Sequence, residues 1–429
     1  MSSPLIGGLC LAAMLVLIAL GCPVALAMAL TGVVGFGLVV AAGPAVAMLG
    51  ATPFESLAEY GFSPIPMFIL MGVFAAKARL SGELFEGARR LFGAWPGGVA
   101  LAAVASCGAF SAISGSSLAT AAGMGRVALP EMARHGYAPG LAAGTVAAGG
   151  TLGIMIPPSI ALLLYALITE QSVGDMFIAG IGPGLLGLAL YGAAIVLMVG
   201  RNPTLARPGT ATGWAEKLAG LKGLLPLVVI FAVVLGGIYG GLFTPTEAAA
   251  VGAFGTLCVA LLRGLGWAGF KDALREALSL SAMVFFMIVG AQILGRFLSV
   301  SRISNELVQL VAELGLGPYA VLAGVLLLFI VLGCVMDSMA MMLLTVPVVF
   351  PLIESAGFDP VWFGILTVVA VEMGLITPPV GMNVFVIKTL LPQARMGTLY
   401  LGVLPFVLAD VVRLLVLIAF PGVALWLVG

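Results

Sequence analysis

Apolar runs long enough to cross a lipid bilayer recur from one end of this 429-residue chain to the other. A helix needs about 20 apolar residues to cross roughly 30 Å of hydrocarbon. Because lipid offers the backbone no hydrogen bonds, such runs must be helical. Only 8% of the residues are charged, whereas a soluble domain carries about 25%. The sequence therefore predicts an all-α polytopic membrane protein.

The apolar pattern predicts ten membrane spans and two further apolar stretches. These stretches, 97–134 and 318–352, are each interrupted near the middle by small or polar residues. We interpret them as re-entrant helical hairpins that enter and leave the membrane on one side. The ten spans are at about 5–21, 24–42, 63–79, 139–168, 178–199, 223–242, 247–262, 278–298, 360–390 and 399–428.

The lysines and arginines support this interpretation. With both hairpins in place, Arg296 and Arg302 fall on one side and Arg413 lies inside the last span, while every other Lys or Arg falls on the opposite side. The positive-inside rule makes that opposite side cytoplasmic and both termini external. If either stretch crossed the membrane once as an ordinary span, the orientation of every later segment would be inverted. The Lys and Arg residues would then no longer gather on one side.

Two long segments match each other when the sequence is shifted by 221 positions, with no insertion. A charged amphipathic stretch, 81–92 or 301–314, precedes each copy and is interpreted as an interfacial arm. The alternative is coincidence in a chain rich in Gly and Pro, but seven positions in register argue against it. The aligned pairs are Ser117 with Ser338, Pro130 with Pro351, Gly136 with Gly357, Pro139 with Pro360, Gly153 with Gly374, and Pro157-Pro158 with Pro378-Pro379.

The two copies are predicted to have opposite orientations in the membrane, because the first hairpin opens to the cytoplasm and the second to the outside. An inverted repeat with paired hairpins can exchange inward- and outward-facing states, which argues for transport. The predicted division is N-terminal scaffold helices in 1–80, a first transport repeat in 81–200, central scaffold helices in 201–300, and a second transport repeat with the last span in 301–429.

The hairpin tips carry polar residues that bare hydrocarbon would not tolerate. The first tip contains Ser114, Gly115, Ser116, Ser117 and Thr120, and the second contains Asp337 and Ser338. Free carbonyls and hydroxyls at such breaks can hold a small cation, while the N-terminus of the returning helix attracts an anion. The alternative is that each Ser or Thr bonds back to its own helix.

Two Gly-x-x-x-Pro-Pro segments lie in the middle of predicted spans, at 153–158 and 374–379. Adjacent prolines remove two amide donors and push the preceding residue out of the α region. We predict that each span unwinds there and exposes carbonyls next to a hairpin tip. A simple proline kink is the alternative.

Charged residues inside predicted spans are functional candidates. Asp337 is interpreted either as a cation ligand or gate, or as a helix cap. Glu372 could contact a cation or pair with a neighbour, Asp410 and Arg413 are predicted to neutralise each other, and Glu247 reads as a helix start. The sequence has no phosphate-binding loop for ATP hydrolysis, so a gradient must supply the energy.

Together these residues resemble the large membrane (permease) subunit of the TRAP (tripartite ATP-independent periplasmic) transporters, DctM-like members of the ion transporter superfamily. The resemblance covers essentially the whole chain, and its most specific segments are 114–120, 153–159, 243–251 and 374–383. It implies sodium-driven import of a small carboxylate across the bacterial inner membrane by an elevator motion, with no enzymatic activity. The implied partners are a small four-span membrane subunit, a periplasmic substrate-binding protein, the organic-acid substrate (a C4-dicarboxylate, sialic acid or another sugar or keto acid) and membrane lipid, with no nucleic acid.

The resemblance also assigns the site residues, with sodium ions as the coupling ions. The residues implied for sodium are Ser114, Gly115, Ser116, Gly153 and Ile156 in the first repeat, and Asp337, Gly374 and Thr377 in the second. The residues implied for substrate are Ser116, Ser117, Thr120, Pro157, Pro158, Ser159, Asp337, Ser338, Pro378, Pro379 and Asn383.

Three other functions remain open from the sequence. The first is a self-sufficient sodium–carboxylate transporter that needs no binding protein. The second is an intramembrane enzyme that uses Asp337 or Glu372 as acid and base, although nothing in the sequence places them together. The third is a channel, which fits two occluding hairpins less well.

Overall fold

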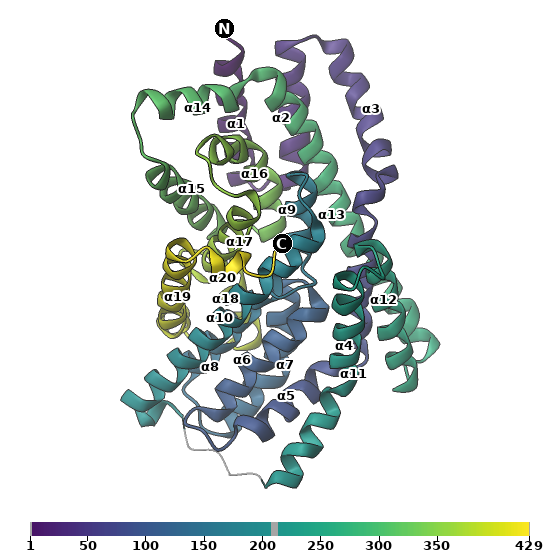
Figure 1. Cartoon of the computed structure of the whole chain (residues 1–429), viewed down its shortest axis with the longest axis vertical. Helices are drawn as coiled ribbons and strands as arrows, with labels where there is room; N and C mark the ends of the chain where they lie inside the picture. Colours follow the sequence, from purple (N-terminus) through teal and green to yellow (C-terminus); the bar gives the residue numbers. More distant parts are fainter. Residues whose placement is uncertain (1, 207–212, 429) are drawn as a thin grey trace.

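A computed structural model describes residues 2–206 and 213–428, and within these ranges the chain is helical, without a β-strand (Figure 1). Arg207, which the charge sorting placed on the cytoplasmic side, lies outside the described residues. The described helices that are long and apolar enough to cross a membrane are Tyr60–Lys77, Val173–Arg201, Pro245–Leu262, Trp267–Ser301, Ser338–Ser355 and Met396–Ala419. Several shorter apolar helices accompany them.

The N-terminal and central helices pack together through small residues. Glycines at the α2–α13 contact let the backbones approach closely: a Cβ on Gly32 would lie 2.9 Å from the backbone nitrogen of Leu294. Helix α13 also contacts α3 and α4, while α12 contacts α4 and α11. These helices are α1 (Ser3–Ala19), α2 (Val24–Val39), α3 (Ala42–Ala58), α4 (Pro64–Lys77), α11 (Trp214–Tyr239), α12 (Pro245–Leu262) and α13 (Trp267–Ser301).

Helix α3 was not predicted. Its apolar run is interrupted by Pro53 and Glu55, so it does not read as a span. It nevertheless buries a face of Ala45, Met48 and Thr52, three to four residues apart, against α2 and α13. Glu55 also pairs with Arg296 of α13. Tertiary packing and this ion pair therefore stabilise a helix that hydropathy does not reveal.

The two charged stretches form amphipathic helices, α5 (Leu80–Phe92) and α14 (Ile303–Glu313). Figure 1 shows α14 near the N-terminus at one end of the long axis and α5 toward the opposite end. Helix α5 packs on α6 and α11, and α14 packs on α16 and α1. Each arm thus leads into the hairpin that follows it.

Each predicted hairpin is a pair of helices that pack against each other across a short break. The first pair is α6 (Gly98–Ser114) with α7 (Ser117–Arg134), and the second is α15 (Pro318–Gly333) with α16 (Ser338–Ser355). The pairs lie in opposite halves of the molecule along its long axis (Figure 1).

Each span with a Pro-Pro pair is interrupted. The first consists of α8 (Pro139–Thr151), the 3-10 turn η2 (Leu152–Ile154) and α9 (Ile160–Ile168). The second consists of α17 (Pro360–Ile376) and α18 (Met382–Leu390). The Pro157–Pro158 and Pro378–Pro379 peptide bonds are both cis.

Several helix ends differ from the prediction, and α11 begins at Trp214 rather than near 223. Helix α13 begins at Trp267 rather than near 278, because its charged first turns continue the helix beyond the apolar segment. The last span ends at Ala419 of α19 (Met396–Ala419), and the short helix α20 (Gly422–Leu425) contacts α10 (Val173–Arg201) and α17. By contrast, Thr244 and Glu247 form the capping box that starts α12, as the sequence predicted.

Candidate functional site

The tip of the first hairpin is built by a left-handed glycine followed by a helix cap. Gly115 has φ +57° and ends α6, a conformation that glycine adopts without a Cβ clash. Ser116 then caps α7, because its Oγ accepts a hydrogen bond from the Ala119 backbone nitrogen at 3.4 Å. The hydroxyls of Ser114 and Thr120 lie 2.5 Å apart, so oxygen atoms cluster at this tip.

Asp337 caps the second hairpin in the same way. Its Oδ1 accepts hydrogen bonds from the backbone nitrogens of Met339 and Ala340, both at 3.1 Å. Of the two roles that the sequence left open for Asp337, the structure shows capping. Ser116 and Asp337 align in the 221-residue shift, so equivalent positions start the returning helix of each hairpin.

The first tip lies directly against the first broken helix. A Cβ on Gly153 would lie 2.7 Å from the carbonyl oxygen of Ser116 and 2.8 Å from Thr120 Oγ1. A Cβ on Gly115 would lie 3.3 Å from the carbonyl oxygen of Pro158. Only glycine at position 153 therefore lets the Ser116 carbonyl and the Thr120 hydroxyl approach the broken helix this closely.

The second tip meets the second broken helix through backbone atoms. The Gly381 nitrogen donates to the Cys334 carbonyl at 3.0 Å, and a Cβ on Gly374 would lie 2.7 Å from the Gly333 Cα. Tyr400 of α19 also holds this break, because its hydroxyl lies 2.8 Å from the carbonyl oxygens of both Pro379 and Val380. The sequence reasoning missed Tyr400.

Side-chain hydrogen bonds join the two repeats. Ser117 Oγ of α7 donates to Asn383 Oδ1 of α18 at 2.8 Å. Asn383 Nδ2 donates in turn to the Ala147 carbonyl of α8 at 3.0 Å. Asn383 is fully buried, so its amide ties the first hairpin, the second broken helix and the first broken helix at one point.

Several residues that were predicted to bind sodium or substrate donate hydrogen bonds to nearby backbone carbonyls. Thr377 Oγ1 donates back to the Met373 carbonyl at 2.6 Å, and Ser159 Oγ donates to the Ile154 carbonyl at 2.5 Å. A hydroxyl that donates in this way keeps lone pairs for a cation. Ile156 directs its side chain toward Gly108 and Gly184, so only its backbone could take part in ion binding.

A buried network of charged and polar side chains includes Thr151, two residues before Gly153, and Glu372, two residues before Gly374. The sequence reasoning missed the full extent of this network. Arg413 of α19 pairs with Glu372 of α17 and lies 3.4 Å from Asp410 Oδ1. Tyr191 of α10 donates to Asp410 Oδ2 at 2.6 Å, and its hydroxyl lies 3.2 Å from Thr151 Oγ1 of α8. Thr151 and Glu372 align in the 221-residue shift. This alignment could have indicated that the two residues share a role.

Gly187 makes room for the Arg413 guanidinium, because a Cβ at this position would overlap Arg413 Nη1. We therefore expect Gly187→Ala to displace the guanidinium and to destabilise the protein by about 1–3 kcal/mol, as overpacking of a core does. Thermal unfolding in detergent would measure the loss. Gly200→Ala on the same helix, where nothing lies within 4 Å, is the matched control, and equal melting temperatures for the two variants would contradict the prediction.

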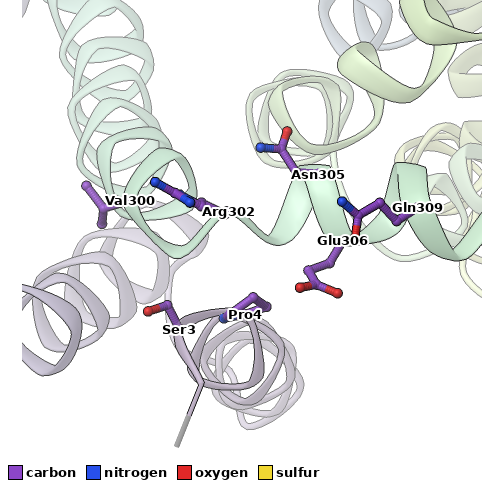
Figure 2. Close-up of a pocket in the computed structure, with 7 residues that line it drawn as sticks. All are labelled: Ser3, Pro4, Val300, Arg302, Asn305, Glu306 and Gln309. Carbon is purple, nitrogen blue, oxygen red and sulfur yellow. The ribbon is translucent and has the colours of Figure 1, made fainter.

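A surface cavity of about 500 Å³ lies apart from the hairpin tips. Its lining consists of Ser3 and Pro4 of α1, Val300 of α13, Arg302, and the α14 residues Asn305, Glu306 and Gln309 (Figure 2). Its lining contains none of the residues predicted for sodium or substrate. The cavity therefore belongs to the junction of α1, α13 and α14, and the candidate site is the contact between hairpin tips and broken helices.

The fold is that of a multi-helix membrane transporter. It resembles the YdaH transporter of Alcanivorax borkumensis, with a TM-score of 0.60 at 16% identity over 89% of each chain. It also resembles MtrF of Neisseria gonorrhoeae, with a TM-score of 0.58 at 15% identity over 90% of this chain and 85% of that one. At these identities the likeness concerns the fold alone.

The sequence comparisons define the family. Residues 11–423 match the model of the DctM component of the tripartite ATP-independent periplasmic transporter. The chain is 39% identical to the C4-dicarboxylate TRAP transporter large permease protein DctM of Pseudomonas aeruginosa over 87% of both proteins. It is 30% identical to the sialic acid TRAP transporter large permease protein SiaM of Vibrio cholerae over 85% of both.

The chain therefore belongs to the DctM family of TRAP transporter large permeases. It is a multi-pass inner-membrane protein and a subunit of a tripartite transporter. Its relatives are permease subunits, so the alternative of an intramembrane enzyme is set aside.

Proposed function

We propose that this permease imports a small organic anion together with sodium ions, by an elevator motion of the two repeats. The observation that carries the proposal is the contact of each hairpin tip with a broken helix, at Gly153 in one half and Gly381 in the other. Broken backbone at such a point offers carbonyl oxygens to a cation and helix N-termini to a carboxylate.

The substrate class follows from the helix caps and from the relatives. The returning helices begin at Ser116 and Asp337, and their N-termini favour anions. Relatives are named for C4-dicarboxylates, sialic acid and ectoine. We therefore propose a carboxylate, selected by a periplasmic binding protein that delivers it to this permease and to a small four-span membrane subunit.

An elevator motion would move the hairpins and broken helices past the helices of 1–80 and 201–300. Small residues where these parts meet support the proposal. A Cβ on Gly72 of α4 would lie 3.1 Å from the Ile113 carbonyl next to the first tip. The purified chain alone, without its partners, is expected to show no uptake, which separates this proposal from a self-sufficient transporter.

The test is sodium-dependent uptake by the complete transporter in proteoliposomes. We expect Ser116→Ala to raise the half-saturating sodium concentration about tenfold, equivalent to about 1.4 kcal/mol of lost binding, with unchanged expression. Ser172→Ala is the matched control, because Ser172 caps α10 through a similar bond to the Asp175 nitrogen at 3.2 Å. The same sodium response in both variants, or uptake in wild type without sodium, would sink the proposal.

A further inference from the structure

The two amphipathic helices α5 and α14 are equivalent parts of the two repeats. Each begins directly after an arginine with left-handed backbone, at φ +56° for Arg79 and +57° for Arg302. A shift of 223 positions places both arginines and the residues after them in register. It aligns Arg79, Ser81, Glu83 and Leu84 with the identical residues Arg302, Ser304, Glu306 and Leu307.

The same face of each of these helices lines a cavity. The cavity beside α5 has a volume of about 220 Å³ and its opposite wall is α11. The cavity beside α14 has a volume of about 500 Å³ and its opposite wall is α1 (Figure 2). The aligned lining residues are Gly82, Glu83 and Glu86 on α5, and Asn305, Glu306 and Gln309 on α14.

In the first repeat, protein groups already occupy this face. Gly87 lets α11 approach closely, since a Cβ there would lie 2.9 Å from the Gly220 carbonyl oxygen. Glu83 pairs with Arg263, which follows α12, at 2.6 Å. The carboxylate at this position therefore has a cation supplied by the chain itself.

In the second repeat, the same face is open and its charges are unpaired. Leu310 replaces Gly87 in the 223-residue shift, and a bulky residue prevents the close helix contact that glycine allows. Within the described ranges, the side chains of Arg302 and Glu306 form no ion pair or hydrogen bond. Arg296, the other basic residue predicted to face outside, is paired with Glu55. The larger cavity thus offers one cation and one anion to a ligand.

The larger cavity lies where apolar helices end. Helix α1 begins at Ser3 and α13 ends at Ser301, beside the amphipathic helix α14. Leu5 and Leu9, one turn apart on α1, are 53% and 52% exposed. An amphipathic helix next to the ends of membrane helices is typical of the bilayer boundary. A ligand in this cavity can therefore have a polar group among the charges and an apolar chain along α1.

We propose that the cavity between α1 and α14 binds the headgroup of a zwitterionic phospholipid that carries a phosphate and a primary ammonium. Arg302 and the N-terminus of α14 bind the phosphate, and Glu306 accepts hydrogen bonds from the ammonium, as Glu83 does from Arg263 in the first repeat. The cavity volume is in the range that holds small ligands. A purely anionic headgroup would leave Glu306 without a cation, and a quaternary ammonium has no N–H group to donate to it.

The test is native mass spectrometry of the delipidated, purified chain with phosphatidylethanolamine, phosphatidylcholine or phosphatidylglycerol. We expect wild type to bind one phosphatidylethanolamine about tenfold more tightly than either other lipid, as a hydrogen bond between charged groups provides. Glu306→Gln should remove the preference over phosphatidylcholine, and Arg302→Gln should weaken the binding of all three lipids. Glu313→Gln, at the other end of α14, is the matched control and should keep the wild-type preference.

Equal affinity of wild type for the three lipids, a result that needs no variant to fold, would overturn the proposal, as would an unchanged preference in Glu306→Gln. Free phosphoethanolamine that binds as tightly as the lipid would show a site for a soluble ligand. Release of the lipid when the complete transporter assembles would show that a protein partner occupies the cavity. Either result would also overturn the proposal. Uptake is not measured, so its failure is distinct from failure of sodium-driven import.

Discussion

Replacement of Arg413 by methionine is expected to destabilise the folded protein by about 3–5 kcal/mol, the usual effect of removing one partner from a buried ion pair. The substitution keeps an apolar stem in the space beside Gly187 but leaves the buried carboxyl groups of Glu372 and Asp410 without their cation. We expect a large drop in melting temperature and in the yield of monodisperse protein, measured by fluorescence-detected chromatography.

Two further variants show whether charge, rather than packing, causes the loss. Arg413→Met combined with Glu372→Gln and Asp410→Asn removes every formal charge and should recover most of the stability. Arg296→Met breaks the pair with Glu55, which is exposed, and should change stability by less than about 1 kcal/mol. A triple variant as unstable as Arg413→Met would contradict the explanation.

The second large effect is expected for Gly153→Ala. The new methyl group would meet the Ser116 carbonyl at 2.7 Å and Thr120 Oγ1 at 2.8 Å, so the first hairpin tip must move away from the broken helix. Displacing groups that support a metal ligand typically lowers metal affinity about 10- to 100-fold. Sodium-dependent uptake should therefore fall steeply, while the protein still folds.

Gly236→Ala in α11 provides the matched control, because nothing lies within 4 Å of a Cβ at that position. Alanine is also the better helix former, by about 1 kcal/mol, so this variant should be at least as stable as wild type and fully active. Wild-type sodium affinity in Gly153→Ala would show that the tip and the broken helix do not form an ion pocket.

The parts of the fold that local chemistry dictates could be predicted from the sequence. Adjacent prolines at 157–158 and 378–379 interrupt their helices whatever surrounds them, and Gly115 with Ser116 marks a helix end followed by a helix start. Thr244 and Glu247 form a capping box for the same reason. The α3 helix could not be predicted, because its stability comes mainly from packing on α2 and α13.

The sequence indicated which residues lie at the hairpin tips and helix breaks, but not which atoms meet there. Ser117 and Asn383 were both candidates, but their hydrogen bond joins positions on different repeats, and a single sequence gives no measure of that proximity. The pairing of Asp410 with Arg413 was predicted from their spacing on one helix, whereas Glu372 joins them only through the packing of α17 on α19. Tyr400 and Tyr191 act through hydroxyl groups whose partners lie on other helices.

The central claim is that each hairpin tip and its broken helix form a sodium pocket, and direct sodium binding to the purified chain tests it. We expect sodium, but not potassium or choline at equal ionic strength, to raise the melting temperature of wild type. The rise should be reduced in Gly153→Ala and in Gly374→Ala, and abolished when both are combined. An equal response to all three cations, or a full sodium response in the double variant, would contradict the claim.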